Sequence, residues 1–222
     1  MNAAVLFSGG KDSVYATYLA TQQDITITCL LTLFSENKES YMFHTPSITK
    51  VEKQAEVMNL PLIIQKTRGE KEKELIDLEY IIKHAKDHCN INAVITGAVE
   101  SAYQASRVQR ICDKLNLECF NPLWQKDQLE LVQDIIAAGF DVIITGVFAY
   151  PLDQTWVGRH IDTSFVEEVQ TLNERYKINI AGEGGEFESY VLNCPLFSTP
   201  LSIKNKNITG QGHSWSMELD VT

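Results

Sequence analysis

Several features that mark exported, membrane-bound or metal-clamped proteins are missing from this sequence. Its 222 residues contain no apolar run approaching the ~20 residues of a transmembrane helix, and no basic, cleavable leader precedes the first apolar segment. The five cysteines are odd in number and scattered without a Cys-x-x-Cys pair, so neither a zinc site nor a redox motif is indicated. We therefore expect a cytoplasmic protein with reduced thiols and no membrane partner.

Positive charge is also scarce. The chain has 19 Lys and Arg residues against 29 Asp and Glu residues, which gives a formal net charge of −10. Proteins that bind tRNA or DNA neutralise backbone phosphates with clustered Lys and Arg, and no basic block stands out here. Nucleic acid is therefore disfavoured as a partner.

Apolar segments alternate with helix-like segments along most of the chain. Strands are expected at 3–7, 25–34, 60–64, 93–97, 117–120 and 141–146, with helices between them. This alternation predicts an α/β fold built on a doubly wound parallel sheet, whose ligands bind beyond the carboxyl ends of the strands. We expect residues 1–150 to form this domain, with the loops near Ser8, Gly97 and Gly146 converging on one cleft. Residues 151–222 are expected to add a small C-terminal α+β appendage.

A glycine-rich turn, Ser8-Gly9-Gly10-Lys11-Asp12-Ser13, joins the first expected strand to a helix. Paired glycines let the backbone approach a ligand closely, and the N–H groups of a helix N-terminus attract an anion. The spacing fits neither a Walker A loop nor a Rossmann fingerprint. It resembles instead the PP-loop of the ATP pyrophosphatase superfamily, which implies a HUP-like ATP-binding domain that splits ATP between its α- and β-phosphates. The alternative is a serine- and glycine-rich turn that binds no ligand.

A second block follows the strand expected at 93–97. Ser101 is placed to cap the next helix, and polar side chains in its first turns would line a cleft beside ATP. A capped amphipathic helix without a ligand explains the same pattern equally well. The candidates are Gly97 and Ser101 for the nucleotide, and Tyr103, Gln104 and Arg107 for the substrate.

The third block, Gly182-Glu183-Gly184-Gly185-Glu186-Phe187-Glu188, interleaves glycines with carboxylates. Such a segment is a poor helix or strand, while carboxylates near a triphosphate are candidate Mg²⁺ ligands or could orient an amine nucleophile. An acidic surface turn is the alternative. Glu183 and Glu186 are candidates for catalysis, and Glu188 for the substrate.

Two further candidates lie in loops. Arg159 follows Trp156 in a loop-like stretch and could neutralise phosphate or bind a carboxylate. His44 precedes a proline-containing turn and could contact a substrate, although a lone histidine is more often structural. Trp156 is also a substrate candidate.

Taken together, these blocks resemble the diphthine–ammonia ligase family, a branch of the PP-loop superfamily. The resemblance covers nearly the whole chain and includes Phe43-His44-Thr45-Pro46, Pro122-Leu123-Trp124 and Gly158-Arg159 besides the three blocks above. Two positions depart from the family pattern, since Gln109 replaces an expected glutamate and Ser47 an expected asparagine. The chain has the length of the compact, stand-alone form typical of archaea.

The resemblance implies an ATP-dependent ligase acting on elongation factor 2. The diphthine carboxylate would attack the α-phosphate of ATP and release pyrophosphate, after which ammonia from solution would displace AMP and give the amide. The residues assigned to nucleotide binding are Ser8, Gly9, Gly10, Lys11, Asp12, Ser13, Gly97 and Ser101. The residues assigned to catalysis are Lys11, Asp12, Arg159, Glu183 and Glu186, with Asp12 and Glu183 as Mg²⁺ ligands.

Other functions fit part of the pattern. A related bacterial branch would amidate a small carboxylate of cobalamin metabolism, and an adenine-nucleotide sensor would bind ATP without turnover. Enzymes that thiolate tRNA or form lysidine in it would need a basic RNA surface, and the sulfur-transfer versions paired catalytic cysteines, for which Cys112 and Cys119 are weak candidates. A homodimer is compatible with the sequence.

Overall fold

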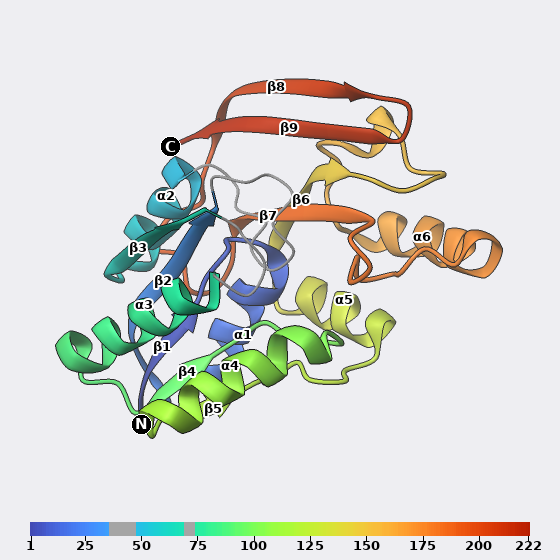
Figure 1. Ribbon diagram of the computed structural model, residues 1–222. Coiled ribbons are helices and arrows are strands. Elements are labelled where there is room, and N and C mark those ends of the chain that lie inside the picture. The colour runs from blue at the N-terminus through green and yellow to red at the C-terminus, as the bar shows by residue number, and fades with distance from the viewer. Residues whose placement is uncertain (36–47, 69–73) are drawn as a thin grey trace. The chain divides into compact units, whose positions relative to one another are not determined.

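The computed structural model describes residues 1–35, 48–68 and 74–222 (Figure 1). Contacts within the chain divide it into two compact units, Met1–Trp124 and Gln125–Thr222. Each unit has its own sheet, and the two are described separately below. Within the described ranges, no helix combines the length and apolar character needed to cross a membrane.

The first unit has a five-stranded sheet with the order β3-β2-β1-β4-β5, and every neighbouring pair is parallel. The predicted doubly wound parallel sheet is therefore confirmed. Its strands are β1 (Asn2–Leu6), β2 (Thr26–Ser35), β3 (Leu62–Thr67), β4 (Ala93–Ile95) and β5 (Glu118–Phe120). Its helices are α1 (Lys11–Thr21), α2 (Ile48–Met58), α3 (Glu74–Cys89) and α4 (Ala102–Leu115).

The strand order reverses between β1 and β4, which lie side by side at the centre of the sheet. Both strands are short and apolar, and Ala3, Val5 and Ile95 have no exposed surface because helices cover both faces of such a sheet. The loops that follow β1 and β4 leave the same edge in opposite directions. A crevice at this point of a doubly wound sheet is where ligands bind.

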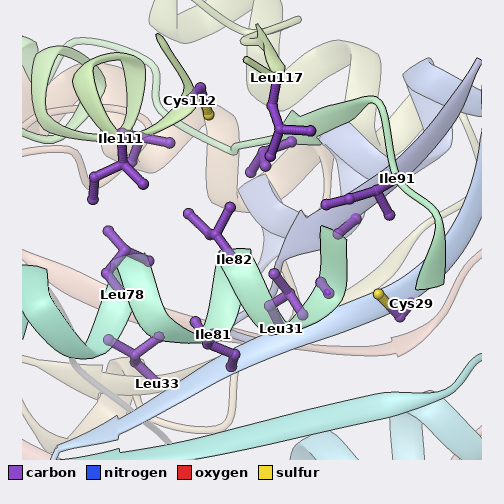
Figure 2. Close-up of a cluster of buried hydrophobic side chains, with 14 residues drawn as sticks. Cys29, Leu31, Leu33, Leu78, Ile81, Ile82, Ile91, Ile111, Cys112 and Leu117 are labelled. Atoms are coloured by element: carbon purple, nitrogen blue, oxygen red, sulfur yellow. The ribbon is translucent and has the colours of Figure 1, made fainter. Parts of the chain in front are cut away.

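The core of the first unit is packed between β2, α3 and α4 (Figure 2). Leu78, Ile81 and Ile82 recur at helical spacing on α3 and are fully buried, with Leu31 of β2 on one side and Ile111 of α4 on the other. The opposite side of α3 faces solvent, with Tyr80, Lys83 and Asp87 exposed, whereas Glu74 in its first turn is buried.

The second unit has a four-stranded sheet with the order β7-β6-β9-β8, and all its pairs are antiparallel. Its elements are α5 (Gln128–Ala137), β6 (Asp141–Val147), η1 (Gln154–Trp156), α6 (Thr163–Tyr176), β7 (Phe187–Asn193), β8 (Ile203–Gln211) and β9 (Ser214–Val221). In Figure 1, β8 and β9 form a long hairpin, drawn in red. This sheet corresponds to the expected α+β appendage.

The assignment of residues 141–146 to the parallel sheet was wrong. These residues form β6, which pairs antiparallel with β7 on one edge and β9 on the other. A buried apolar run such as Val142-Ile143-Ile144 reads the same in either kind of sheet, so its sequence does not reveal its partners. The loop after Gly146 therefore belongs to the second unit and does not follow a strand of the parallel sheet.

Asp162 caps the N-terminus of α6. One carboxylate oxygen accepts hydrogen bonds from the Phe165 N–H at 2.9 Å and from the Ser164 hydroxyl at 2.7 Å. These bonds, that from Phe165 most of all, hold the pKa of Asp162 below its ordinary value. Because the folded-state pKa is depressed, the stabilisation is present above the unfolded-state pKa and is lost as the pH falls through the folded-state pKa.

We expect the substitution Asp162→Ala to lower the free energy of unfolding by about 1 kcal/mol at neutral pH. The loss should shrink at acidic pH, as the pH falls through the depressed folded-state pKa of Asp162 and the wild-type carboxylate is itself protonated. Urea denaturation at both pH values measures the difference. Asp162→Ser, which retains a capping oxygen, should keep most of the stability, and a loss independent of pH would contradict the capping role.

Candidate active site

Hydrogen bonds among its own atoms connect the two ends of the loop between β1 and α1. Gly9 adopts φ +79°, a conformation that favours glycine, and Gly10 is the N-cap of α1 without any side-chain cap. The Ser13 hydroxyl donates to the Gly10 carbonyl at 3.1 Å, and the Ser8 and Ser13 hydroxyls lie 3.2 Å apart. The first N–H groups of α1 are thus not used by a side-chain cap, as anion binding at a helix N-terminus requires.

Two close approaches fix the position of this loop. A Cβ atom added to Gly9 would lie 2.3 Å from the Gln54 side-chain oxygen, and the Gln54 amide donates to the Gly9 carbonyl at 3.0 Å. A Cβ atom added to Gly97 would lie 2.8 Å from the Asp12 carbonyl carbon and 2.8 Å from the Ser13 nitrogen. The expected proximity of the loops at Ser8 and Gly97 is therefore confirmed, and Gly97 permits backbone-to-backbone packing against α1.

Lys11 and Asp12 form an ion pair in the first turn of α1. The Lys11 ammonium donates to both carboxylate oxygens of Asp12, at 2.9 and 2.8 Å. Only 4% of the Lys11 side chain is exposed, against 25% of the Asp12 side chain. The lysine is therefore held in the first turn of the helix by its neighbour, although the sequence suggested a mobile charge.

Two predicted site residues, Ser101 and Arg107, interact with other residues of helix α4 itself. The Ser101 hydroxyl accepts from the Gln104 N–H at 3.3 Å, which confirms the predicted cap. The Arg107 guanidinium carbon lies 3.3 Å from the centroid of the Tyr103 ring, and its Nη1 lies 3.4 Å from the Tyr103 carbonyl oxygen. Arg107 therefore stacks on its own helix, and its role toward a substrate stays a prediction.

The glycine- and glutamate-rich segment forms an irregular turn before β7. Gly182 and Gly185 have φ values of +77° and +82°, which explains the glycines there. One oxygen of Glu186 accepts from the Asn179 N–H at 3.0 Å, while its other oxygen is buried and has no hydrogen-bond partner among the described residues. A Cβ atom at Gly184 would lie 2.6 Å from the first of these oxygens. Glu186 thus points back into the turn and connects its two ends.

The other two carboxylates of the segment lie in different surroundings. Glu183 is half-buried in the turn, and Glu188 is exposed on β7. The structure therefore separates three residues that look equivalent in the sequence: Glu183 and Glu186 are both half-buried in the turn, where Glu186 accepts from its backbone, whereas Glu188 is exposed on β7. None of these placements tests a catalytic role.

Arg159 is bound by Glu168. Its two terminal nitrogens donate to the two Glu168 oxygens at 2.9 and 2.8 Å, and its guanidinium carbon lies 4.4 Å from the centroid of the Trp156 ring. The hydrogen bonds to Glu168 raise the pKa of Arg159, and those from Arg159 lower the pKa of Glu168. Trp156 is almost fully buried and packs edge-to-face on Phe165, 5.9 Å between centroids. Both predicted site residues are therefore held by neighbours in the second unit.

The comparisons with known proteins decide the family. Residues 1–119 match the sequence model described as "Diphthamide synthase N-terminal domain", and residues 127–219 match "Diphthamide synthase C-terminal domain". The chain belongs to the diphthine–ammonia ligase family. The predicted resemblance to this family is confirmed, and with it the expectation that the protein is a ligase.

Relatives in this family align along most of the chain. A diphthine–ammonia ligase of Danio rerio is 32% identical over 91% of this chain and 86% of its own length. A diphthine–ammonia ligase of Schizosaccharomyces pombe is 30% identical over 94% of this chain, but the chain spans only 37% of that protein. A solved structure, the predicted subunit of a tRNA methyltransferase from Methanocaldococcus jannaschii, aligns over 88% of this chain and 98% of its own, with 16% identity and a TM-score of 0.46.

Of the two departures from the family pattern, one can be placed. Gln109 is exposed on α4 and donates to Asp113 at 2.7 Å, so a glutamate there would face a like charge four residues away. His44 and Ser47 lie outside the described residues, and the predicted substrate contact of His44 stays a prediction.

The sequence reasoning missed two residues of this ligase: Gln54, which supports the phosphate loop, and Thr96, which holds the turn at Gly97. Gln54 is fully buried and occupies a position on the apolar stripe of α2, between Val51 and Ala55, and this polar residue in an apolar stripe was the available signal. Thr96, after β4, bonds the Asn121 side chain at 2.5 Å and the Ala98 N–H at 3.2 Å. Thr96 and Asn121 are 25 residues apart, so no local sequence pattern indicated that they would pair.

No magnesium site is preassembled among the described residues of the ligase. In the parts of the chain that the structure describes, no group of three or more His, Cys, Asp or Glu side chains could hold a metal ion. Both carboxylate oxygens of Asp12 accept hydrogen bonds from Lys11, and Glu183 belongs to the second unit. The described residues by themselves therefore do not make a metal cage.

We expect Glu186→Ala to lower the free energy of unfolding of the ligase by about 1–3 kcal/mol, because the Asn179 N–H would lose its acceptor. Glu186→Gln retains an oxygen for this bond and should be much less damaging. Urea denaturation of both variants measures the difference. Equal losses in the two variants would show that the charge, and not the hydrogen bond, is what matters.

Proposed function

We propose that this ligase activates the diphthine carboxylate of elongation factor 2 with ATP and amidates it with ammonia, releasing AMP and pyrophosphate. The observation that carries the proposal is the loop from Ser8 to Ser13, in a chain that belongs to the diphthine–ammonia ligase family. Its backbone runs from a central strand into a helix without a side-chain cap, at the switch point of a doubly wound sheet. This arrangement suits the phosphates of ATP.

In the proposed reaction, the loop holds pyrophosphate as it leaves. The N–H groups at the start of α1 and the hydroxyls of Ser8 and Ser13 would donate to phosphate oxygens. Lys11 would supply the positive charge, and for this its ammonium would be shared between Asp12 and the phosphates. Because Gly97 and Gln54 hold the loop backbone in place, little reorganisation is needed on binding.

The remaining assignments are proposals about the two units. Gly97 and Ser101 would help to shape the nucleotide site of the first unit, and Tyr103, Gln104 and Arg107 would lie toward the substrate. In the second unit, Glu183 and Arg159 would act on the substrate or on developing charge, and for this Arg159 would have to exchange Glu168 for its new partner.

The proposal includes Mg²⁺ as an ion bound together with ATP. This ion is often bound by one or two carboxylates together with substrate phosphates and water, so a cage made of protein side chains is not required. Asp12 and Glu183 are the proposed carboxylates, and the ion would neutralise phosphate charge when bound. No step above depends on it.

The test is product analysis with ATP, Mg²⁺, ammonium and elongation factor 2 carrying diphthine. AMP and pyrophosphate, formed only when ammonium and the modified factor are both present, would support the reaction and the acceptor. AMP formation with another carboxylate alone would keep the chemistry and replace the acceptor. ATP binding without AMP under every condition would contradict the proposal.

A further inference from the structure

Two buried threonines flank the strand that leads into the phosphate loop, one on each side. β1 lies between β2 and β4 in the sheet (Figure 1), and Thr32 belongs to β2, whereas Thr96 directly follows β4. Only 1% of Thr32 and 5% of Thr96 is exposed. A buried hydroxyl is costly unless it is hydrogen-bonded, so the partners of these two side chains show which parts of the backbone they hold.

Thr32 binds the backbone at the entrance to the loop. Its hydroxyl donates to the Phe7 carbonyl at 2.7 Å, and the Phe7 N–H donates to the Leu31 carbonyl at 2.8 Å. Phe7 is the residue between the end of β1 and Ser8, so both polar groups of its backbone are bonded to β2. The direction in which the chain enters the loop is therefore fixed by the neighbouring strand.

Thr96 fixes the turn that packs against the loop from the other side. Its hydroxyl donates its single proton to the Asn121 side-chain oxygen at 2.5 Å, and the hydroxyl oxygen accepts from the Ala98 N–H at 3.2 Å. These bonds hold the backbone on both sides of Gly97. Because Gly97 leaves no room for a Cβ atom against the first turn of α1, a shift of this turn is transmitted directly to that helix.

The sheet itself does not depend on either hydroxyl. The backbone pairs of β1 with β2 and of β4 with β5 involve no side chain, and the Thr96 N–H donates to the Phe120 carbonyl at 3.1 Å. Valine has the shape of threonine without the hydroxyl and is equally suited to a strand. A threonine-to-valine substitution therefore removes the contact with the loop and leaves the strand pairing in place.

We propose that Thr32 and Thr96 are positioning residues whose hydroxyls hold the phosphate loop in its ligand-binding conformation before ATP arrives. A loop that is fixed in advance binds its ligand at a lower entropic cost. A loop that samples other conformations binds with an affinity reduced by the fraction of time that it spends in the competent one. The inference rests on the proposed function for the identity of the ligand, and neither threonine is assigned a contact with ATP.

The first experiment needs no ligand. Amide hydrogen exchange of residues 7–14 is followed by mass spectrometry in the full-length protein. We expect exchange to be about fivefold faster in Thr32→Val and in Thr96→Val than in the wild type, because the loop opens more often. Thr32→Ser and Thr96→Ser retain the hydroxyl and should return the rate to within about twofold of the wild type.

Thr28→Val is the matched control for this measurement. The Thr28 hydroxyl donates to the Ala3 carbonyl at 3.2 Å, near the amino ends of β1 and β2 and so at the edge of the sheet opposite the loop. This variant should leave the exchange of residues 7–14 unchanged. Wild-type exchange in a valine variant would overturn the role of that threonine, and an equal acceleration in Thr28→Val would overturn the role of both.

The second experiment measures the affinity for ATP by calorimetry and the KM for ATP in AMP formation. Each valine variant should bind ATP about tenfold more weakly, with kcat within about twofold of the wild type, because saturating nucleotide restores the loop. Asn121→Leu should weaken binding in the same way, and adding it to Thr96→Val should cause no further loss, since both act through one hydrogen bond. Lower thermal stability with unchanged ATP affinity would show a purely structural role and overturn the proposal.

The two proposals fail in different ways. Faster exchange of the loop in the valine variants of a protein that never forms AMP would retain the support of the loop and refute the proposed reaction. Unchanged exchange and unchanged ATP affinity in these variants, with AMP formed as expected, would overturn the positioning role and leave the reaction intact.

Discussion

Replacing Gly97 with valine is expected to reduce AMP formation at least 100-fold. The added Cβ would lie 2.8 Å from two backbone atoms of the first turn of α1, and neither atom can rotate away as a side chain could. The helix start must therefore move, and displacement of a catalytic element by about 1 Å is enough for a loss of this size. Overpacking should also cost about 3 kcal/mol of stability.

The variant is measured by AMP formation and ATP binding at a temperature where it is shown to be folded. Gly212→Ala is the control, because its Cβ would meet nothing within 4 Å, and only its φ of +57° is unfavourable. It should lose about 1 kcal/mol of stability and no activity. Wild-type ATP affinity in Gly97→Val would show that the contact with α1 does not position the loop.

Substitution of Lys11 by methionine is expected to lower AMP formation by 100- to 1,000-fold, the range found when a donor to developing charge is removed. Methionine retains the buried aliphatic stem but supplies no positive charge for pyrophosphate. The fold should survive, since the Asp12 carboxylate that loses its partner is partly exposed and can be hydrated.

Pre-steady-state measurement of AMP formation and a separate titration with ATP distinguish chemistry from binding. Lys83→Met is the matched control, because Lys83 also forms an ion pair with a nearby aspartate but is 59% exposed on α3. This variant should keep full activity. Turnover of Lys11→Met within threefold of wild type would mean that the N–H groups of the loop suffice without the lysine.

Much of the first unit could be predicted because its signals are local. Helix α4 begins directly after Ser101, the residue expected to cap it, since the capping hydrogen bond spans only three residues. The phosphate loop is likewise a contiguous motif. Its place between strand and helix follows from the order of apolar and glycine-rich segments alone.

Fewer of the predicted site residues could be assigned a role from the sequence. The structure brings Gly97 against the loop that contains Asp12, as expected, but it also shows contacts that explain some candidates without a ligand. Arg159 is bound by Glu168, Arg107 stacks on Tyr103, and Glu186 bonds its own turn. A polar residue in a loop does not reveal in its sequence whether its partner is a substrate or a neighbour.

The sequence by itself determined the family, the parallel sheet and the loop for phosphate, because all three rest on motifs and periodicities within short segments. Only the tertiary structure decided that β6 joins an antiparallel sheet, that Gln54 supports Gly9, and that Thr32 binds the Phe7 carbonyl. These contacts join residues far apart in the chain. Their energy depends on which surfaces meet after folding, and no local pattern records that choice.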